Sequence, residues 1–536
     1  MLRSRRLNVQ KIEILDSTLR DGSQCEGISF SVSDKLKIAE SLDRFGVDYI
    51  EAGNPASNPK DMEFFEKAAK MRFSTSKLAA FGATVHKGQS PENDEGIKAL
   101  LAAGTKYTVI FGKAWDLHVD CILGASLEEN LEMISSTISY LHSRGRTVFF
   151  DAEHFFDGYK ANPGYALDVI KTAEKAGAAT VVLCDTNGGC FPDEISKIVK
   201  TAKKELKTVI GIHCHNDTGC AAANSVAAVK AGALHIQGTF TGIGERCGNA
   251  ALSTIIPDLK LKLGYNVISS KRLKALTKTA RFINEVTNIR LPSNAPYVGG
   301  SAFSHKGGMH VDGVIKNSAT YEHVSPLDVG NKRNFLVSEV SGRSSVLPRI
   351  KAIDKKLTKS SEETKQITEK MKELEHAGFQ FEAAAASFEL LAMKELGRFT
   401  PHFEIDHYRI ISSMDSLDGQ SYTEKANALV KVKVGDRYEI TADEGEGPVN
   451  AIDKALRKAL EVFYPELRKM HLIDFKVRVV TSDDSTAAIT RVLIESTDGE
   501  NTWTTMGASR DIINASVVAL TDSLEYMLKD VSPSVR

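Results

Sequence analysis

The chain lacks any run of apolar residues close to the roughly 20 that a membrane-spanning helix needs. It also lacks an excess of either charge, since 68 Lys and Arg stand against 69 Asp and Glu. This balance gives no support for binding to nucleic acid or to an anionic membrane. Arg3, Arg5 and Arg6 are not followed by an apolar segment, so we expect no secretory signal. These absences predict a cytoplasmic protein with neither a membrane nor a nucleic-acid partner.

The seven cysteines are odd in number and show no CxxC spacing. This pattern is typical of reduced thiols in a cytosolic enzyme and argues against a disulfide framework. The 536 residues are too many for one ordinary domain and predict two or three. An apolar content of 42% is ordinary for a globular protein.

The N-terminal half repeats one pattern, in which a short β-branched or aromatic run ends in polar residues and an amphipathic segment follows. In the segment 33–45, for example, Ser33 and Asp34 indicate the N-cap and Gly46 the end of a helix. Eight such units over about 240 residues predict an α/β fold, a closed (β/α)₈ TIM barrel. The eight strand-like runs are 12–15, 47–51, 78–84, 107–111, 147–150, 180–183, 208–212 and 234–239.

An open, doubly wound sheet is the alternative architecture for the same pattern. Such a sheet more often carries a glycine-rich phosphate-binding turn after its first strand. This chain instead has DSTLRD at positions 16–21. The closed barrel is therefore the favoured interpretation.

Two histidines end the seventh strand-like run, in the sequence IHCHND at positions 212–217. Side chains alternate along a strand, so His213 and His215 share one face while Cys214 points to the other. Paired imidazoles are common ligands of divalent metals, although two histidines at a strand end also occur as hydrogen-bonded rim residues. The hexapeptide alone does not decide between these interpretations.

Barrel closure supplies further ligands, because strand eight then lies between strands one and seven. The residues that follow these strands meet at the C-terminal mouth, and they include Arg20 and Asp21 after the first and Asn249 after the eighth. One carboxylate, two imidazoles and an amide oxygen suit Mg²⁺, Mn²⁺, Fe²⁺ or Zn²⁺. The barrel therefore favours the metal interpretation.

Other strand ends bring more polar groups to the same mouth. With a metal, an arginine and a nearby carboxylate, the pocket suits binding of a 2-oxo acid and transfer of a proton. We expect at least half of the carboxylates to be rim groups that pair with lysines. The polar residues at the other strand ends are Glu51, Asn54, Asp151, Glu153, His154, Asp185, Thr186 and Asn187.

Three ordered motifs resemble the signatures of the isopropylmalate, homocitrate and citramalate synthase family. They are LRDGSQ at 19–24 with Lys35 downstream, HCHNDTG at 213–219 and GIGERCGN at 242–249. The resemblance continues through HKGGMHVDG at 305–313 and into the C-terminal region. The sequence DAEHFFDG at 151–158 is most similar to the citramalate branch of the family.

This resemblance implies a Claisen condensation of acetyl-CoA with a 2-oxo acid, which is pyruvate in the citramalate branch. It also implies that a divalent metal ion (Mn, Mg or Zn) chelates the 2-oxo acid. By motif, the implied ligands are Asp21, His213, His215 and Asn249. Arg20 corresponds to a catalytic cation beside the oxygen that gains negative charge.

The resemblance also assigns roles to residues outside the metal site. Thr186 corresponds to a residue that hydrogen-bonds the substrate carboxylate, and Glu153 to a base for the acetyl methyl group. His310 and Tyr321 resemble a catalytic pair that reaches in from the neighbouring subunit. Asp151 occupies a substrate-binding position where related enzymes can carry tyrosine, and this difference leaves the selectivity of the pocket open.

The chain after the barrel predicts helices at 270–286 and 349–396 and, from Thr400, a repeated ββα pattern. We expect a barrel at 1–265, helical linker subdomains at 266–398 and an α+β domain at 399–536. The last resembles the family's allosteric domain, which implies a homodimer with isoleucine or leucine as regulator. A purely dimerising module is the alternative.

Other functions share some of these features. Isopropylmalate or homocitrate synthase would use the same chemistry on a longer 2-oxo acid. A metal-dependent aldolase or acyl-CoA lyase would share the Arg-Asp and His-x-His elements, but the C-terminal module argues against it. A non-catalytic metabolite sensor would explain that module but not the convergent metal ligands.

Overall fold

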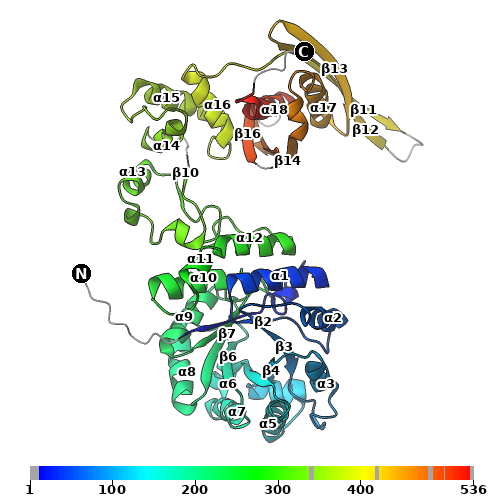
Figure 1. The fold of residues 1–536 in the computed structure, drawn as a ribbon, viewed down its shortest axis with the longest axis vertical. Coiled ribbons are helices and arrows are strands. Elements are labelled where there is room, and N and C mark those ends of the chain that lie inside the picture. Colours follow the sequence, from blue (N-terminus) through cyan, green and yellow to red (C-terminus); the bar gives the residue numbers. More distant parts are fainter. Residues whose placement is uncertain (1–10, 337–342, 417–421, 481–486, 500, 532–536) are drawn as a thin grey trace. The chain divides into compact units, whose positions relative to one another are not determined.

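The computed structural model describes residues 11–336, 343–416, 422–480, 487–499 and 501–531. The chain forms two compact units. The first ends at Phe303 and also takes in His323–Arg333, and the second consists of Ser304–Glu322 and the chain from Asn334 onwards. The colours of Figure 1 follow the chain from the first unit, in blue to green, into the second.

The first unit contains a closed barrel of eight parallel strands, as the sequence predicted (Figure 1). Closure is made by β1 and β8, which pair from Glu13 opposite His235 to Asp16 opposite Gly238. The strands are β1 (Glu13–Asp16), β2 (Tyr49–Glu51), β3 (Lys77–Ala83), β4 (Tyr107–Lys113), β5 (Thr147–Glu153), β6 (Thr180–Asp185), β7 (Val209–Cys214) and β8 (His235–Gly238).

Helices follow the strands, and their apolar faces pack against the outside of the barrel. The longer ones are α1 (Val32–Phe45), α2 (Pro59–Ala68), α3 (Glu95–Ala102), α5 (Leu127–Ser143), α7 (Pro163–Lys175), α8 (Pro192–Glu205) and α9 (Ala221–Ala231), and the short ones are α4 (Asp116–His118), α6 (Phe155–Ala161) and α10 (Leu252–Pro257).

The start of α1 differs from the prediction. Ser31 is the N-cap, and it forms a capping box with Asp34, three residues later. The cap at Ser33 was therefore wrong by two residues, because Val32 and Ser33 already belong to the first helical turn. Gly46 ends the helix as predicted, in the left-handed conformation with φ 99°.

Side-chain alternation gives the barrel two apolar layers. Leu15, Tyr49, Ala79, Val109 and Phe149 form a separate small cluster, which we assign to the barrel interior. Residues of the opposite parity, such as Ile14, Ile50 and Ile212, belong to the large cluster between strands and helices. The inward positions near the strand ends carry the polar groups of the mouth.

Beyond the barrel, the first unit continues into α11 (Ser270–Leu273) and α12 (Leu276–Thr287), so the helix predicted at 270–286 is broken near Ala275. The second unit begins with β9 (Ser304–His305) and α13 (Gly308–Lys316), and β9 pairs with β10 (Asn334–Phe335). Three helices follow, α14 (Arg343–Ile353), α15 (Glu362–His376) and α16 (Ala385–Glu395).

The C-terminal region is a duplicated βββα module, with one strand more per repeat than the predicted ββα. The sequence interpretation missed β11 and β14, although β14 alternates apolar and polar residues from Ile473 to Val479. The apolar side chains of that strand are exposed. The first repeat is β11 (Glu404–Ser416), β12 (Tyr422–Val434), β13 (Arg437–Gly445) and α17 (Pro448–Leu460), and the second is β14 (His471–Val479), β15 (Thr490–Thr497), β16 (Thr502–Ser509) and α18 (Ile512–Leu528).

Among the described residues, no helix combines the length and the apolar character needed to cross a membrane.

Candidate active site at the barrel mouth

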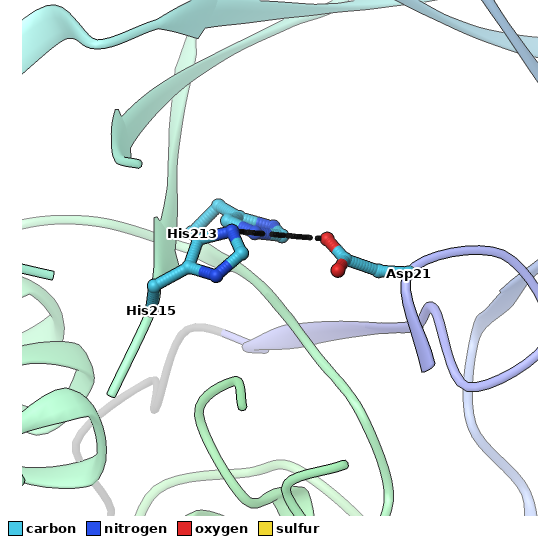
Figure 2. Close-up of side chains that lie close together, drawn as sticks. All are labelled: Asp21, His213 and His215. Atoms are coloured by element: carbon cyan, nitrogen blue, oxygen red, sulfur yellow. Dashed lines mark hydrogen bonds and ion pairs between the residues drawn. The ribbon is translucent and has the colours of Figure 1, made fainter. Parts of the chain in front are cut away.

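Asp21, His213 and His215 converge at the C-terminal end of the barrel (Figure 2). His213 Nε2 lies 3.4 Å from Asp21 Oδ2 and 3.4 Å from His215 Nε2. His215 Nε2 lies 3.9 Å from the same carboxylate oxygen. All three side chains are buried, and Cys214 between the histidines packs on the opposite face in the apolar cluster, as alternation requires.

The three atoms have the geometry of a metal site. A point equidistant from atoms separated by 3.4, 3.4 and 3.9 Å lies about 2.1 Å from each, the usual metal–ligand distance for imidazole nitrogen or carboxylate oxygen on Zn²⁺ or Mg²⁺. Asn249 adjoins them, since its Nδ2 donates to Asp21 Oδ1 at 3.0 Å. Its own amide oxygen is buried and has no hydrogen-bond partner among the described residues. The group is therefore a candidate metal site.

The electrostatics of Asp21 and His215 favour cation binding. Burial by itself raises the pKa of Asp21, but the charge of Arg20 and the contact with His213 outweigh it, and the pKa is lowered. Burial, with the charge of His213, lowers the pKa of His215 to about 4. For His213, burial lowers the pKa, yet the hydrogen bond and charge of Asp21 raise it overall. An ionised carboxylate and a neutral imidazole are the forms that bind metals.

Arg20 is fixed on three sides beside the candidate metal site. Its Nε donates to Glu51 Oε2 at 2.7 Å, and its Nη1 lies 3.2 Å from Asp21 Oδ2. Its guanidinium carbon sits 3.8 Å from the centre of the Phe81 ring. Glu51 is fully buried and also accepts a hydrogen bond from Ser17. These contacts therefore hold the Arg20 guanidinium in a fixed position.

A cavity of about 220 Å³ opens beside these groups. Phe81 and Phe111, whose rings stack at 5.3 Å, form an apolar wall. The cavity brings together the barrel residues predicted to be catalytic, substrate-binding or metal-binding, except Asn249. The other polar strand-end residues predicted at the mouth are not part of its lining, namely Glu51, Asn54, His154, Asp185 and Asn187. Its lining comprises Arg20, Asp21, Gln24, Phe81, Phe111, Asp151, Glu153, Cys184, Thr186, His213, His215 and Glu245.

The carboxylates of the mouth do not pair with lysines as often as expected. Of Glu51, Asp151, Glu153 and Asp185, only Glu153 pairs with a lysine, Lys113, within the described part of the chain. The expectation of at least half was wrong, because burial selects arginine, backbone and amide partners. Asp185, for example, accepts from the backbone N–H groups of Gly189 and Cys190.

Comparison with known families accounts for nearly the whole chain. Residues 11–283 match the HMGL-like family, 297–378 the homocitrate synthase post-HMGL domain-like family, and 382–528 the LeuA allosteric (dimerisation) domain. The chain is 51% identical to the (R)-citramalate synthase of Aquifex aeolicus, over 97% of this chain and 98% of that protein. It is 48% identical to the enzyme of the same name from Geobacter sulfurreducens, over 96% and 97%.

The chain belongs to the (R)-citramalate synthase family. A 2-isopropylmalate synthase, from Lactococcus lactis subsp. lactis, is only 31% identical, over 95% of each chain. The family resemblance inferred from the three motifs is thus confirmed, as is the combination of a barrel with a LeuA-type domain.

The sequence interpretation missed several residues of this citramalate synthase family site. Phe81, Phe111 and Lys113 were missed because apolar strand residues and lysines are common everywhere and carry no signal of their own. Gln237 of β8 was missed too, although a signal existed. It is a buried polar residue of β8, two residues after His235 and therefore on the same face of the strand.

The two predicted catalytic residues outside the barrel lie in the second unit of the chain. The rings of His310 and Tyr321 stack, with centroids 4.1 Å apart and an interplanar angle of 25°. Gly313 permits this contact, because a Cβ there would lie 2.7 Å from Tyr321 Cε2. Both side chains are exposed. Their catalytic role stays a prediction.

Proposed function

We propose that this protein condenses acetyl-CoA with pyruvate and, with water, releases (R)-citramalate and CoA. The observation that carries the proposal is the near-complete alignment, at about half identity, with enzymes of that name. The convergence of Asp21, His213 and His215 beside a fixed arginine supports it. In this reaction a new C–C bond joins the acetyl methyl carbon to the ketone carbon of pyruvate, and the thioester is hydrolysed.

Asp21, His213 and His215 would hold a divalent ion, Mn²⁺, Mg²⁺ or Zn²⁺, with Asn249 as a further ligand. When bound, the ion supplies a Lewis acid that polarises the ketone of the 2-oxo acid. Arg20 provides a fixed positive charge for the oxygen that becomes an alkoxide. Since Glu51 and Phe81 hold the guanidinium, little reorganisation is needed as that charge develops.

Thr186 and Asp151 are the proposed contacts to pyruvate. Thr186 Oγ1 accepts the backbone N–H of His154 at 2.9 Å, which leaves its own hydroxyl proton free for the substrate carboxylate. Asp151 borders the same cavity. The small cavity and the rings of Phe81 and Phe111 suit the methyl group of pyruvate better than a branched or carboxylated tail.

Glu153 is the proposed base for the acetyl methyl group. It lines the cavity and is oriented by an ion pair with Lys113. The proton moves from the methyl carbon to the carboxylate, and the resulting carbon nucleophile attacks the ketone. His310 and Tyr321, supplied by the neighbouring subunit of a homodimer, would assist enolisation or thioester hydrolysis.

The C-terminal region supports regulation by an end-product amino acid. Residues 382–528 match an allosteric and dimerisation domain, so we propose feedback by isoleucine, with leucine as the alternative effector. The proposed domains are the barrel at 1–265, linker subdomains at 266–398 and the regulatory domain at 399–536. The proposed setting is the cytoplasm.

Release of CoA from acetyl-CoA, followed with a thiol reagent, tests the proposal. Pyruvate, 2-oxoisovalerate and 2-oxoglutarate are supplied in turn at equal concentration. We expect pyruvate to give the highest kcat/KM. A clear preference for 2-oxoisovalerate or 2-oxoglutarate would refute the citramalate assignment in favour of isopropylmalate or homocitrate synthesis. Cleavage of a hydroxyacyl-CoA without condensation would instead indicate a lyase.

A further inference from the structure

Gln237 links the candidate metal site to the substrate pocket through a fully buried side chain. Its Oε1 lies 3.0 Å from His213 Nδ1, and its Nε2 donates to Asp151 Oδ1 at 2.8 Å. The Asp151 carboxyl group determines which end of the Gln237 amide faces each partner. When Asp151 is ionised its carboxylate can only accept, so it takes the amide N–H, the amide oxygen faces the imidazole and His213 Nδ1 is the donor.

This arrangement sets the tautomer of His213. With the proton on Nδ1, the lone pair of Nε2 is directed to the corner where Asp21 Oδ2 and His215 Nε2 lie, 3.4 Å away in each case. A metal-binding histidine generally needs such a partner on its second nitrogen, which orients the ring and raises its basicity. The partner here is a neutral amide.

The same amide orients Asp151. This side chain borders the cavity from β5, which is separated from β8 by β6 and β7, and the hydrogen bond from Gln237 ties it to β8. Because Oδ1 is held by Gln237, the orientation of the carboxyl group toward the cavity is fixed. One residue therefore constrains both a proposed ligand and a proposed substrate contact.

We propose that Gln237 is a positioning residue that sets metal affinity through His213 and selection of the 2-oxo acid through Asp151. The part that concerns the 2-oxo acid rests on the proposed function, whereas the part that concerns the metal does not. Gln237 touches neither substrate nor metal in this scheme and acts through its two partners.

Two substitutions separate the roles. Gln237→Met keeps the volume but removes both hydrogen bonds, and Gln237→Glu keeps an acceptor for His213 Nδ1 but loses the donor to Asp151. Thr137→Val is the matched control, since Thr137 is a fully buried barrel residue whose hydroxyl accepts the Val85 N–H at 2.9 Å, away from the site. Thermal melting of each variant checks that the fold is retained.

Mn²⁺ binding to the metal-stripped full-length protein, measured by calorimetry without substrates, is the first readout. We expect Gln237→Met to weaken binding about 10- to 100-fold and Gln237→Glu and Thr137→Val to stay close to the parent. A folded Gln237→Met variant with parental affinity would overturn the proposal. So would a loss in Gln237→Glu or in Thr137→Val as large as that in Gln237→Met.

The second readout is the KM for pyruvate at saturating Mn²⁺. We expect both Gln237 variants to raise it by about fivefold, because both lose the donor to Asp151. An unchanged KM in both would overturn the role in substrate selection. If the parent protein does not use pyruvate at all, the proposed function fails, but the Mn²⁺ titration still tests the metal-positioning role independently.

Discussion

The ionisation of Asp151 gives a quantitative test of the barrel mouth. Burial, reinforced by the charge of Glu51, raises the pKa of Asp151 to about 7. A carboxyl group whose pKa is higher in the folded than in the unfolded chain destabilises the fold once it must ionise. This free-energy cost is absent below the pKa of the aspartate in the unfolded chain, which is near 4. It grows as the pH rises toward the folded-state pKa of about 7, and it is constant above that pH.

Asp151→Asn removes the ionisation while keeping an oxygen that accepts from Gln237. The pKa of Asp151 is about 7 in the folded chain and near 4 in the unfolded chain. With these two values, the free-energy cost of ionising Asp151 in the folded parent protein increases by about 2 kcal/mol between pH 5.5 and pH 8. The variant has no such dependence. Its advantage in the free energy of unfolding should therefore widen by about 2 kcal/mol over this range, or about 4–8 °C in Tm.

Differential scanning calorimetry of parent and variant at half-unit pH steps, in chelator and without substrates, measures this difference. Titrating groups that do not interact with Asp151 are common to both proteins and cancel in the comparison. A Tm difference that stays constant from pH 5.5 to pH 8, or one that narrows, would refute the interpretation of Asp151 as a buried carboxyl group with a raised pKa.

Three further predictions concern the metal, the cation and the regulatory domain. Asp21→Ala or His215→Ala should abolish Mn²⁺ binding and metal-dependent turnover, and full activity of either variant, or of the parent in chelator, would contradict the metal site. Arg20→Lys should lower kcat by about 10²–10³-fold, since lysine keeps the charge but loses the fixed contact to Glu51; unchanged single-turnover rates would contradict this. Truncation near Thr400 should abolish inhibition by isoleucine in the CoA-release assay, and inhibition that survives truncation would exclude the C-terminal domain as the effector site.

The barrel and the convergence of the candidate metal site were predictable because both follow from periodicity. Alternation along β7 put His213 and His215 on one face, and pairing of β8 with β1 then brought Asp21 and Asn249 to them. These are consequences of strand geometry that require no knowledge of side-chain packing.

The contacts across the barrel were not predictable in the same way. Gln237 is 86 residues from Asp151 in the chain, and only the closed barrel shows that the two side chains meet. The contact between the Phe81 ring and the Arg20 guanidinium could not be predicted from the sequence either. The helix start at Ser31 was missed for a local reason, since Ser31 and Ser33 are both suitable capping residues. The additional strand β14 was missed although its residues alternate from Ile473 to Val479, so that omission has no such physical reason.

The balance of charge at the barrel mouth relates the raised pKa of Asp151 to the candidate metal site. Three buried carboxyl groups, Asp21, Glu51 and Asp151, lie near one partly buried guanidinium, that of Arg20. Arg20 contacts Glu51 and Asp21 but makes no hydrogen bond to Asp151 among the described residues, so the excess negative charge falls on Asp151 and contributes to its raised pKa. A divalent cation held by Asp21 and the two histidines would reduce that excess. The pH dependence of the Asp151→Asn comparison should therefore flatten when Mn²⁺ replaces chelator, because the cation favours the ionised form of Asp151 in the folded parent.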